Sequence, residues 1–229
     1  MRYEIKGDSL PVLIMYLEAE ESIIVRGSGM SWMTPNMKLE ASHQAGRLGK
    51  VFGRKSSQEL SHLHIYTAKT GTGMISCASR FPGAILPFEI KEGKNLVLLS
   101  SAFLCAERNV ELSPHYQKKI NPGFFGGDGI VMKKISGSGI CFAEFDGHVV
   151  KYELQAGQQI VIEAGNLAAM SETCTMDIHT VSGIRNSLFG GDELYNTIVT
   201  GPGSVWLQTM PETGLAASLR KYLPFHTGK

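Results

Sequence analysis

Short runs of apolar residues, separated by turn residues, follow one another along most of the chain. In segment 150–154 apolar residues alternate with Lys151 and Glu153, which predicts a half-buried strand. The runs 96–99 and 160–162 are continuously apolar and rich in branched side chains, which is typical of strands covered on both faces. Glycine is abundant at 26 residues and falls at regular intervals, as expected of tight turns between strands. The pattern therefore predicts an all-β fold.

A helical pattern is visible near the C-terminal end of the sequence. Apolar residues recur there with the spacing of one helix face, at Leu215, Leu219, Tyr222 and Leu223. Thr213 could cap the start of this helix, and Pro224 would end it. We expect one short helix that lies over an open sheet edge or against a neighbouring subunit.

One block of sequence occurs three times. Each copy opens with Phe-Gly, at Phe52-Gly53, Phe125-Gly126 and Phe189-Gly190. Each copy then reaches a Gly-x-Gly followed by an apolar run, at Gly71-Thr72-Gly73, Gly137-Ser138-Gly139 and Gly201-Pro202-Gly203. Successive Gly-x-Gly motifs are 66 and 64 residues apart, and this spacing predicts a supersecondary unit stacked on copies of itself.

The third copy stops soon after its Gly-x-Gly, and the start of the chain supplies what it lacks. The apolar segments 21–25 and 30–33 look like the missing strands. We therefore expect a single domain over residues 1–229, with pseudo-repeats at about 52–115, 125–180, and 189–210 completed by 10–41. This division predicts a closed body of three lobes, in which the two chain ends build one lobe together.

Charge and composition narrow the range of partners. The formal net charge is +1, so no electrostatic attraction to nucleic acid or anionic lipid is expected. The first residues lack the apolar core of a signal peptide, and no apolar stretch approaches the roughly 20 residues of a membrane-spanning helix. The four cysteines form no C-x-x-C motif. We expect a cytoplasmic protein that binds no nucleic acid, and the sequence leaves peripheral membrane association open.

An exposed apolar surface is the next candidate feature. Four large apolar residues lie close together in the sequence, at Met30, Trp32, Met33 and Met37. Methionine and tryptophan are typical of adaptable contact surfaces, which favours an interaction surface here. The alternative is that Trp32 and the second tryptophan, Trp206, are ordinary core or interface side chains. We expect self-association through paired or covered sheet edges.

Several short motifs accompany the repeat. They are Ser136-Gly137-Ser138-Gly139-Ile140, Pro82-Gly83-Ala84-Ile85, Phe103-Leu104-Cys105-Ala106 and the C-terminal Gly201-Pro202-Gly203-Ser204-Val205-Trp206-Leu207-Gln208-Thr209. In these motifs, and over about Ser9 to Pro224, the chain resembles the AIM24 family, whose function is unknown.

The resemblance implies a fold and a mode of assembly. It implies a fold akin to that of the tryptophan RNA-binding attenuation protein, a short relative of the double-stranded β-helix. Folds of this type tend to assemble into rings or trimers, so we expect a homo-oligomer, with a trimer favoured, and an unknown protein partner. Fungal mitochondrial relatives in the family are linked to inner-membrane organisation, although a shared fold does not by itself identify a function.

The pair His62 and His64 is the candidate metal site. On a strand, residues two apart face the same side, so both imidazoles could bind one metal ion. Cupin metal sites begin with the same His-x-His, but they add a glutamate a few residues later, and here no acidic residue follows before Glu89. Two surface histidines on an edge strand are the alternative. The sequence indicates no cofactor and no catalytic residue.

Two classes of function remain open. The first is a non-catalytic scaffold that oligomerises and contacts partner proteins. The second is a small-ligand-binding or cupin-like metal-binding protein, which would use a cavity between lobes or the histidine pair. The scaffold is favoured because the titratable residues are scattered along the chain.

Overall fold

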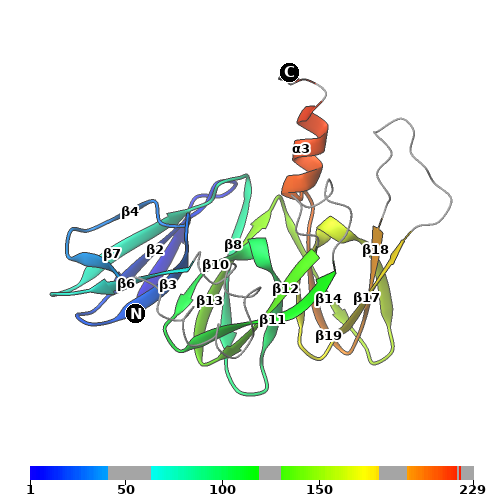
Figure 1. Cartoon of the computed structure of the whole chain (residues 1–229), viewed down its shortest axis with the longest axis horizontal. Coiled ribbons are helices and arrows are strands. Elements are labelled where there is room, and N and C mark those ends of the chain that lie inside the picture. Colours follow the sequence, from blue (N-terminus) through cyan, green and yellow to red (C-terminus); the bar gives the residue numbers. More distant parts are fainter. Residues whose placement is uncertain (41–62, 119–129, 181–194, 221, 223–229) are drawn as a thin grey trace.

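Antiparallel β-sheets make up almost the whole of the described structure (Figure 1). The structure is a computed structural model, and it describes residues 1–40, 63–118, 130–180, 195–220 and Tyr222. The three Phe-Gly motifs and His62 lie outside the described residues. The all-β prediction is confirmed.

The first strand is β1 (Arg2–Lys6). The strands after it fall into three groups of six, which we number in chain order. The first group is β2 (Val12–Leu17), β3 (Ser22–Arg26), β4 (Trp32–Met33), β5 (Met37–Glu40), β6 (Leu63–Ala68) and β7 (Gly73–Ala78). The second is β8 (Gly83–Ile90), β9 (Leu96–Leu99), β10 (Phe103–Glu107), β11 (Val110–Lys118), β12 (Ile130–Gly137) and β13 (Gly139–Asp146). The third is β14 (Val149–Leu154), β15 (Gln159–Glu163), β16 (Leu167–Ser171), β17 (Thr175–Thr180), β18 (Tyr195–Thr200) and β19 (Gly203–Gln208).

The strands form four sheets with related strand orders. The first sheet is β1-β2-β7-β4, and the second is β5-β6-β3-β10-β13-β8. The third sheet is β11-β12-β9-β16-β19-β14, and the fourth is β15-β18-β17. Adding six to each strand number of the second sheet gives the order of the third sheet. Short 3-10 turns, Ser100–Ala102 and Ala164–Asn166, also recur at the same place, before β10 and before β16.

Two strand pairings join successive strand groups, and we call each of them a joint. At the first joint β3 pairs antiparallel with β10, with Ile24 opposite Ala106. At the second joint β9 pairs antiparallel with β16, with Val97 opposite Met170. Each six-stranded sheet therefore consists of three strands from one group and three strands from the next.

The N-terminal and C-terminal strands do not pair with each other among the described residues. The N-terminal β2 and β4 pair with β7, whereas β19 pairs with β14 and β16. In Figure 1 the blue N-terminal strands and the strands β17 and β18 lie at opposite ends of the body. The described strands therefore show no pairing between the segments 10–40 and 195–210. The boundaries of the pseudo-repeats stay a prediction.

Three hydrophobic cores lie between successive sheets. Leu13, Met15 and Ile75 of the first sheet pack in one cluster with Ile23 and Phe142 of the second. A second cluster joins the second and third sheets, and a third cluster joins the third and fourth sheets. The two middle sheets are thus apolar on both faces. This explains the continuously apolar run 96–99 in β9, whose first three residues are buried.

The similar run 160–162 in β15 has a different environment. Ile162 is buried, but Val161 is 62% exposed. The prediction that both faces of this run are covered is therefore wrong for the single chain. The reason is that β15 belongs to the fourth sheet, which has a core on only one of its faces.

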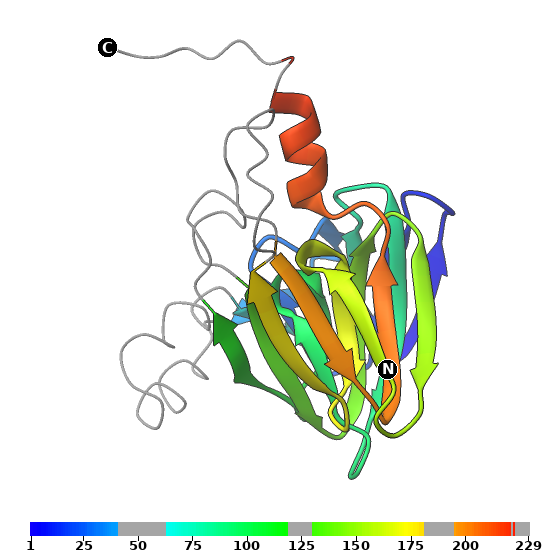
Figure 2. The ribbon, with the colours of Figure 1, turned by 90° about the vertical axis from the view of Figure 1, so that its right-hand side faces the viewer.

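The helix α3 (Glu212–Arg220) forms where the apolar spacing predicted a helix. It begins one residue before Thr213, and its first backbone N–H, that of Glu212, donates to the Asp146 carboxylate at 3.0 Å. Figures 1 and 2 show α3 standing away from the sheets. Leu219 and Tyr222 are exposed, so the described part of the helix does not cover a sheet edge of its own chain.

The Gly-x-Gly motifs lie at the turns before β7, β13 and β19, and the backbone there explains the glycines. Gly137 has a φ of +92°, and a Cβ on it would lie 2.3 Å from the carbonyl oxygen of Asn109. Gly71, the equivalent glycine of the first motif, has a φ of +56° with open space around it. The first motif thus needs glycine for its backbone angle alone, and the second needs it also for space.

We expect Gly137→Ala to destabilise the fold more than Gly71→Ala does. The first substitution combines a strained φ with a backbone clash, so it should cost at least about 3 kcal/mol. The second meets only the left-handed penalty, about 1 kcal/mol. Urea unfolding followed by circular dichroism measures both values. Equal costs for the two variants would contradict the assignment of the clash at Asn109.

A buried ion pair reinforces the first joint. Arg26, at the end of β3, donates to Glu144 of β13 at 2.7 Å, and the two side chains are 14% and 6% exposed. Burial raises the pKa of Glu144, but hydrogen bonds from the Arg80 backbone N–H, the Ser79 hydroxyl and Arg26 outweigh burial. The pKa of Glu144 is therefore lowered from its ordinary value of 4.5. The carboxylate stays charged because three donors surround it.

We expect Arg26→Met to cost about 3 kcal/mol of unfolding free energy at neutral pH, because it leaves a buried carboxylate without its cation. Because the pKa of Glu144 is lowered in the folded state, the stability that this carboxylate contributes is complete above its ordinary pKa of 4.5 and is lost as the pH falls through the folded-state pKa. The difference between wild type and variant should therefore shrink in acid. Urea unfolding at neutral and acidic pH measures it. Lys91→Met, which removes an exposed partner of Glu89, is the matched control and should change little at either pH.

Candidate functional site

The histidine pair can be followed only in part, because His62 lies outside the described residues. His64 lies on β6 between the buried residues Leu63 and Ile65, and its side chain is half-buried. Its Nδ1 atom is buried without a hydrogen-bond partner, and its ring lies 6.3 Å from the ring of Tyr66. Within the described part of the chain, no three His, Cys, Asp or Glu side chains are grouped closely enough to hold a metal ion. Metal binding by this pair stays a prediction.

The four cysteines are buried and reduced. Burial raises the pKa of Cys141 to about 12. Burial is also the largest cause of the raised pKa of Cys105, whose Sγ lies 3.7 Å from the sulfur of Met15. A thiol is nucleophilic as its thiolate, which burial disfavours. These cysteines pack as small apolar side chains in the cores.

Glu144 and Asp146 are the two perturbed carboxyl groups that lie close together. They are two residues apart on β13, so they face the same side of the strand. Burial raises the pKa of Asp146, whereas the pKa of Glu144 is lowered, a contrast also seen in catalytic acid–base pairs. The cavity between them holds only about 10 Å³, which is room for one water molecule. Arg26 and Ser79 occupy the Glu144 carboxylate, so this cluster has a structural role.

A larger groove lies beside the second joint. It has a volume of about 340 Å³, close to the lower limit of small-ligand sites. Trp206 of β19 lies in it, with the ring of Phe88 edge-on at 5.2 Å and Lys151 Nζ 5.3 Å from the indole ring. Trp206 is therefore partly buried against the core and partly open to the groove.

A second groove of about 320 Å³ lies beside the first joint, at the matching place in the strand order. Its lining is more polar and includes Glu20, Glu21, Glu107 and Arg108. The two grooves thus lie at equivalent places in the strand order, but the side chains that line them differ in polarity. Small-ligand binding in either groove stays a prediction.

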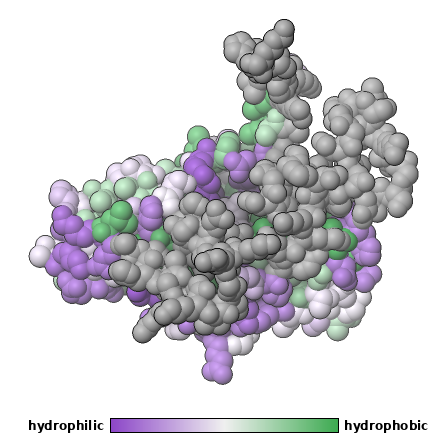
Figure 3. All heavy atoms as spheres, viewed as in Figure 1, coloured by the Kyte–Doolittle hydropathy of each residue, from purple (hydrophilic) through white to green (hydrophobic). Residues whose placement is uncertain are grey.

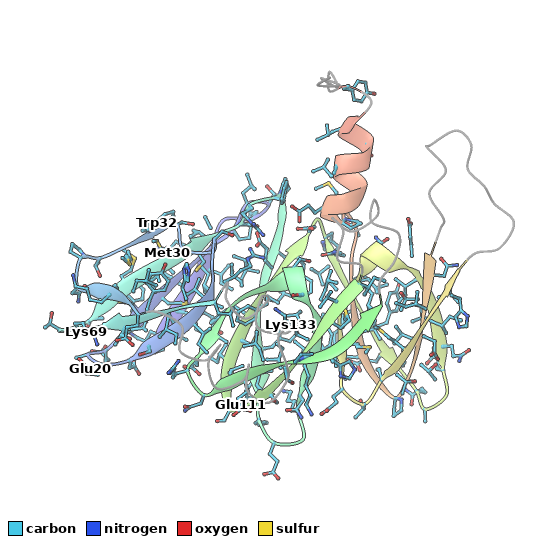
Figure 4. All side chains as sticks on the ribbon, viewed as in Figure 1. Glu20, Met30, Trp32, Lys69, Glu111 and Lys133 are labelled. Atoms are coloured by element: carbon cyan, nitrogen blue, oxygen red, sulfur yellow. The ribbon has the colours of Figure 1, made fainter. Side chains whose placement is uncertain are left out.

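The four residues proposed from the sequence as an interaction surface have different environments. Met37 is buried, and Met30 and Met33 are partly buried against the core between the first two sheets. Trp32 is 47% exposed and lies on the two-residue strand β4. Figure 4 shows Met30 and Trp32 close together on the segment that contains β4. Trp32 is therefore the residue of the four that is most available for contacts.

Further exposed apolar residues lie on sheet edges, and sequence reasoning missed them. Val161 of β15 is 62% exposed, Leu39 of β5 is 54% exposed, and Tyr152 of β14 is 46% exposed. Each of these strands, like β4, ends a sheet. On the face drawn in Figure 3, small hydrophobic areas lie among hydrophilic ones. The sequence does not show the order of the strands in the sheets, and this order was needed to find these residues. An apolar strand residue is exposed when its strand has no neighbouring strand or when no second sheet packs on that face of its sheet.

The described residues include no helix that is both long and apolar enough to cross a membrane.

Comparisons with known proteins agree with the motif resemblance. An uncharacterised protein of Streptococcus pyogenes serotype M6, M6_Spy0233, is 26% identical over 231 residues, which span 98% of this chain and 92% of that protein. The crystal structure of protein SPYM3_0169 from Streptococcus pyogenes is similar with a TM-score of 0.76 and 25% identity, covering 97% of this chain and 99% of that one. The profile of the family described as mitochondrial biogenesis AIM24 matches residues 3–210. The chain therefore belongs to the AIM24 family.

Proposed function

We propose that this protein is a non-catalytic scaffold that assembles with copies of itself and contacts other proteins through its sheet edges. The single observation that carries this proposal is the placement of exposed apolar side chains on edge strands. Trp32, Leu39, Tyr152 and Val161 are each on the last strand of a different sheet.

The physical reason is that an edge strand has backbone N–H and C=O groups ready to pair with another strand. Monomeric proteins protect such edges with charged residues, prolines or bulges. Here the edge residues Trp32 and Val161 are large and apolar instead, and apolar surface removed from water stabilises association. Edges of this kind support strand addition by another chain.

The joints within the chain support the same proposal. At each of the two joints, the paired strands are far apart in the sequence and belong to different groups. Apolar side chains of these strands are buried in the cores. Within one chain, sheets are thus already extended by pairing the edge strand of one group with the edge strand of the next. The same chemistry applied between chains gives an assembly without a catalytic centre.

We expect the purified full-length protein to form a discrete homo-oligomer at micromolar concentration. A trimer is favoured, with a mass of about 75 kDa for chains of 24.9 kDa. Because apolar contacts drive the association, the mass should change little between low and high salt. Light scattering coupled to size-exclusion chromatography measures the mass, and elemental analysis of the same fractions measures bound metal.

A matched variant separates the scaffold from the metal-binding alternative. His62→Ala combined with His64→Ala should leave the mass, the melting temperature and the metal content of the protein nearly unchanged. Stoichiometric metal that disappears in this variant would favour the metal-binding protein. A wild-type protein that stays at the mass of one chain over the whole concentration range would rule out self-assembly.

A further inference from the structure

The groove beside the second joint lies next to an aromatic side chain whose counterpart at the first joint is covered. Phe142 of β13 and Trp206 of β19 each lie three residues after the last glycine of a Gly-x-Gly motif. Phe142 packs in the core between the first and second sheets, and Trp206 packs against the core between the second and third sheets. Phe142 is fully buried, whereas Trp206 is only partly buried. Two equivalent aromatic side chains therefore differ in whether a further group covers them.

The side chain that covers Phe142 is Tyr3 of β1. Its ring lies edge-on to the ring of Phe142, with 4.8 Å between the ring centroids. The strand β1 pairs with β2 and ends the first sheet beyond it. The equivalent of β2 in the second sheet is β8, because β8 pairs with β13 as β2 pairs with β7. Since β8 itself ends the second sheet, the described strands provide no counterpart of Tyr3 at the second joint.

The groove at the second joint has an apolar floor. Leu86 and Phe88 of β8 line it together with Trp206, and all three are partly buried against the core. Phe88 lies edge-on to Trp206 at 5.2 Å, but a space of about 340 Å³ stays open beside the two rings. Aromatic side chains favour contact with further rings, and the apolar area that such contact removes from water stabilises it. A planar apolar group therefore fits here, as the ring of Tyr3 fits at the first joint.

The charged side chains that line the groove are Glu89, Lys94 and Lys151. Lys151 is paired with Glu153 at 2.6 Å, and Glu89 is paired with Lys91 at 3.1 Å. Lys94 has the weakest pairing of these lysines, because its Nζ atom lies 3.8 Å from the Glu89 carboxylate that Lys91 already neutralises. Its ammonium group is therefore the cation of the groove that is most available to an anion from outside.

From these observations we propose that the groove beside the second joint binds a small aromatic anion, such as an aromatic carboxylate of one or two rings. The ring lies against Trp206 and Phe88, in the place that Tyr3 has at the first joint, and the anionic group faces Lys94. A largely apolar pocket with a few polar groups that fix the orientation is typical of small-ligand sites. The site is built by one chain, so it is independent of the proposed self-assembly.

The groove beside the first joint differs in both respects. Tyr3 already supplies the aromatic ring there, and the charged side chains that line the groove are Glu20, Glu21, Glu107 and Arg108. Three carboxylates against one guanidinium disfavour an anion. We therefore expect one binding site in each chain, at the second joint.

The test uses anilinonaphthalene sulfonate, a fluorescent aromatic anion, as the probe. In the full-length Trp32→Phe variant, Trp206 is the sole tryptophan, so energy transfer from tryptophan to the probe reports binding near Trp206. We expect saturable binding of one probe per chain, with a Kd on the order of tens of micromolar for a ligand of this size. Naphthoate should displace the probe. Naphthalenemethanol, which has the same rings without the charge, should displace it about threefold less well.

Two substitutions test the ring site and the charge separately. Ser204→Phe places a ring in the groove, which Ser204 lines, and should abolish binding. Lys94→Met removes the cation and should raise the Kd of the probe about threefold. Lys91→Met is the matched control, because Lys91 lies on the same turn but does not line the groove, and it should leave the Kd nearly unchanged. Lys94 is exposed, so its variant should fold even if Ser204→Phe does not.

Three results would overturn the site. The first is the absence of saturable binding at millimolar probe. The second is an unchanged Kd in both Ser204→Phe and Lys94→Met, which would place the probe elsewhere on the protein. The third is equal displacement by naphthoate and naphthalenemethanol, which would exclude an anion as the ligand. Circular dichroism spectra and melting temperatures of all variants show whether a loss of binding reflects the groove or the fold.

Discussion

The backbone pairing between successive strand groups is the constraint on which the rest of the structure depends. Within a group the strands are divided between two sheets, and neither set of three makes a complete core alone. The pairing of β3 with β10, and of β9 with β16, fuses these sets into sheets with apolar side chains on both faces. Each core then forms between two sheets, so the burial of side chains follows from the pairing of edges.

Near the two joints, equivalent positions are occupied by different polar side chains. Glu144 of β13 and Gln208 of β19 lie five residues after the last glycine of their Gly-x-Gly motifs. Glu144 binds Arg26, which also donates to the carbonyl oxygen of Ser101. Gln208 needs no cation, because its own amide donates to the carbonyl oxygen of Gly165 at 3.0 Å. The carbonyl groups of Ser101 and Gly165 lie at equivalent places in the two 3-10 turns. The first accepts from a cation that is paired with a carboxylate, and the second accepts from a neutral amide. Of these two arrangements, only the ion pair makes its part of the fold sensitive to acid.

Much of the fold could be predicted from local patterns. The alternation in segment 150–154 became strand β14, and the Gly-x-Gly motifs fell at the turns before β7, β13 and β19. Long-range features could not be predicted in this way. Arg26 and Glu144 are 118 residues apart, and nothing near either residue indicates the other. Val161 has the same local pattern as Val97, and only the strand order shows that one is at an end and the other inside. The candidate metal ligands His62 and His64 lacked a third ligand in the sequence, and His62 lies outside the described residues.

The shift of six between the strand orders has a consequence for how such proteins can change in size. Since each group meets the next through the same kind of pairing, tandem duplication or loss of a whole group alters the length of the molecule without creating a new type of contact. The number of groups in such a chain can thus change, while the contact between neighbouring groups stays the same.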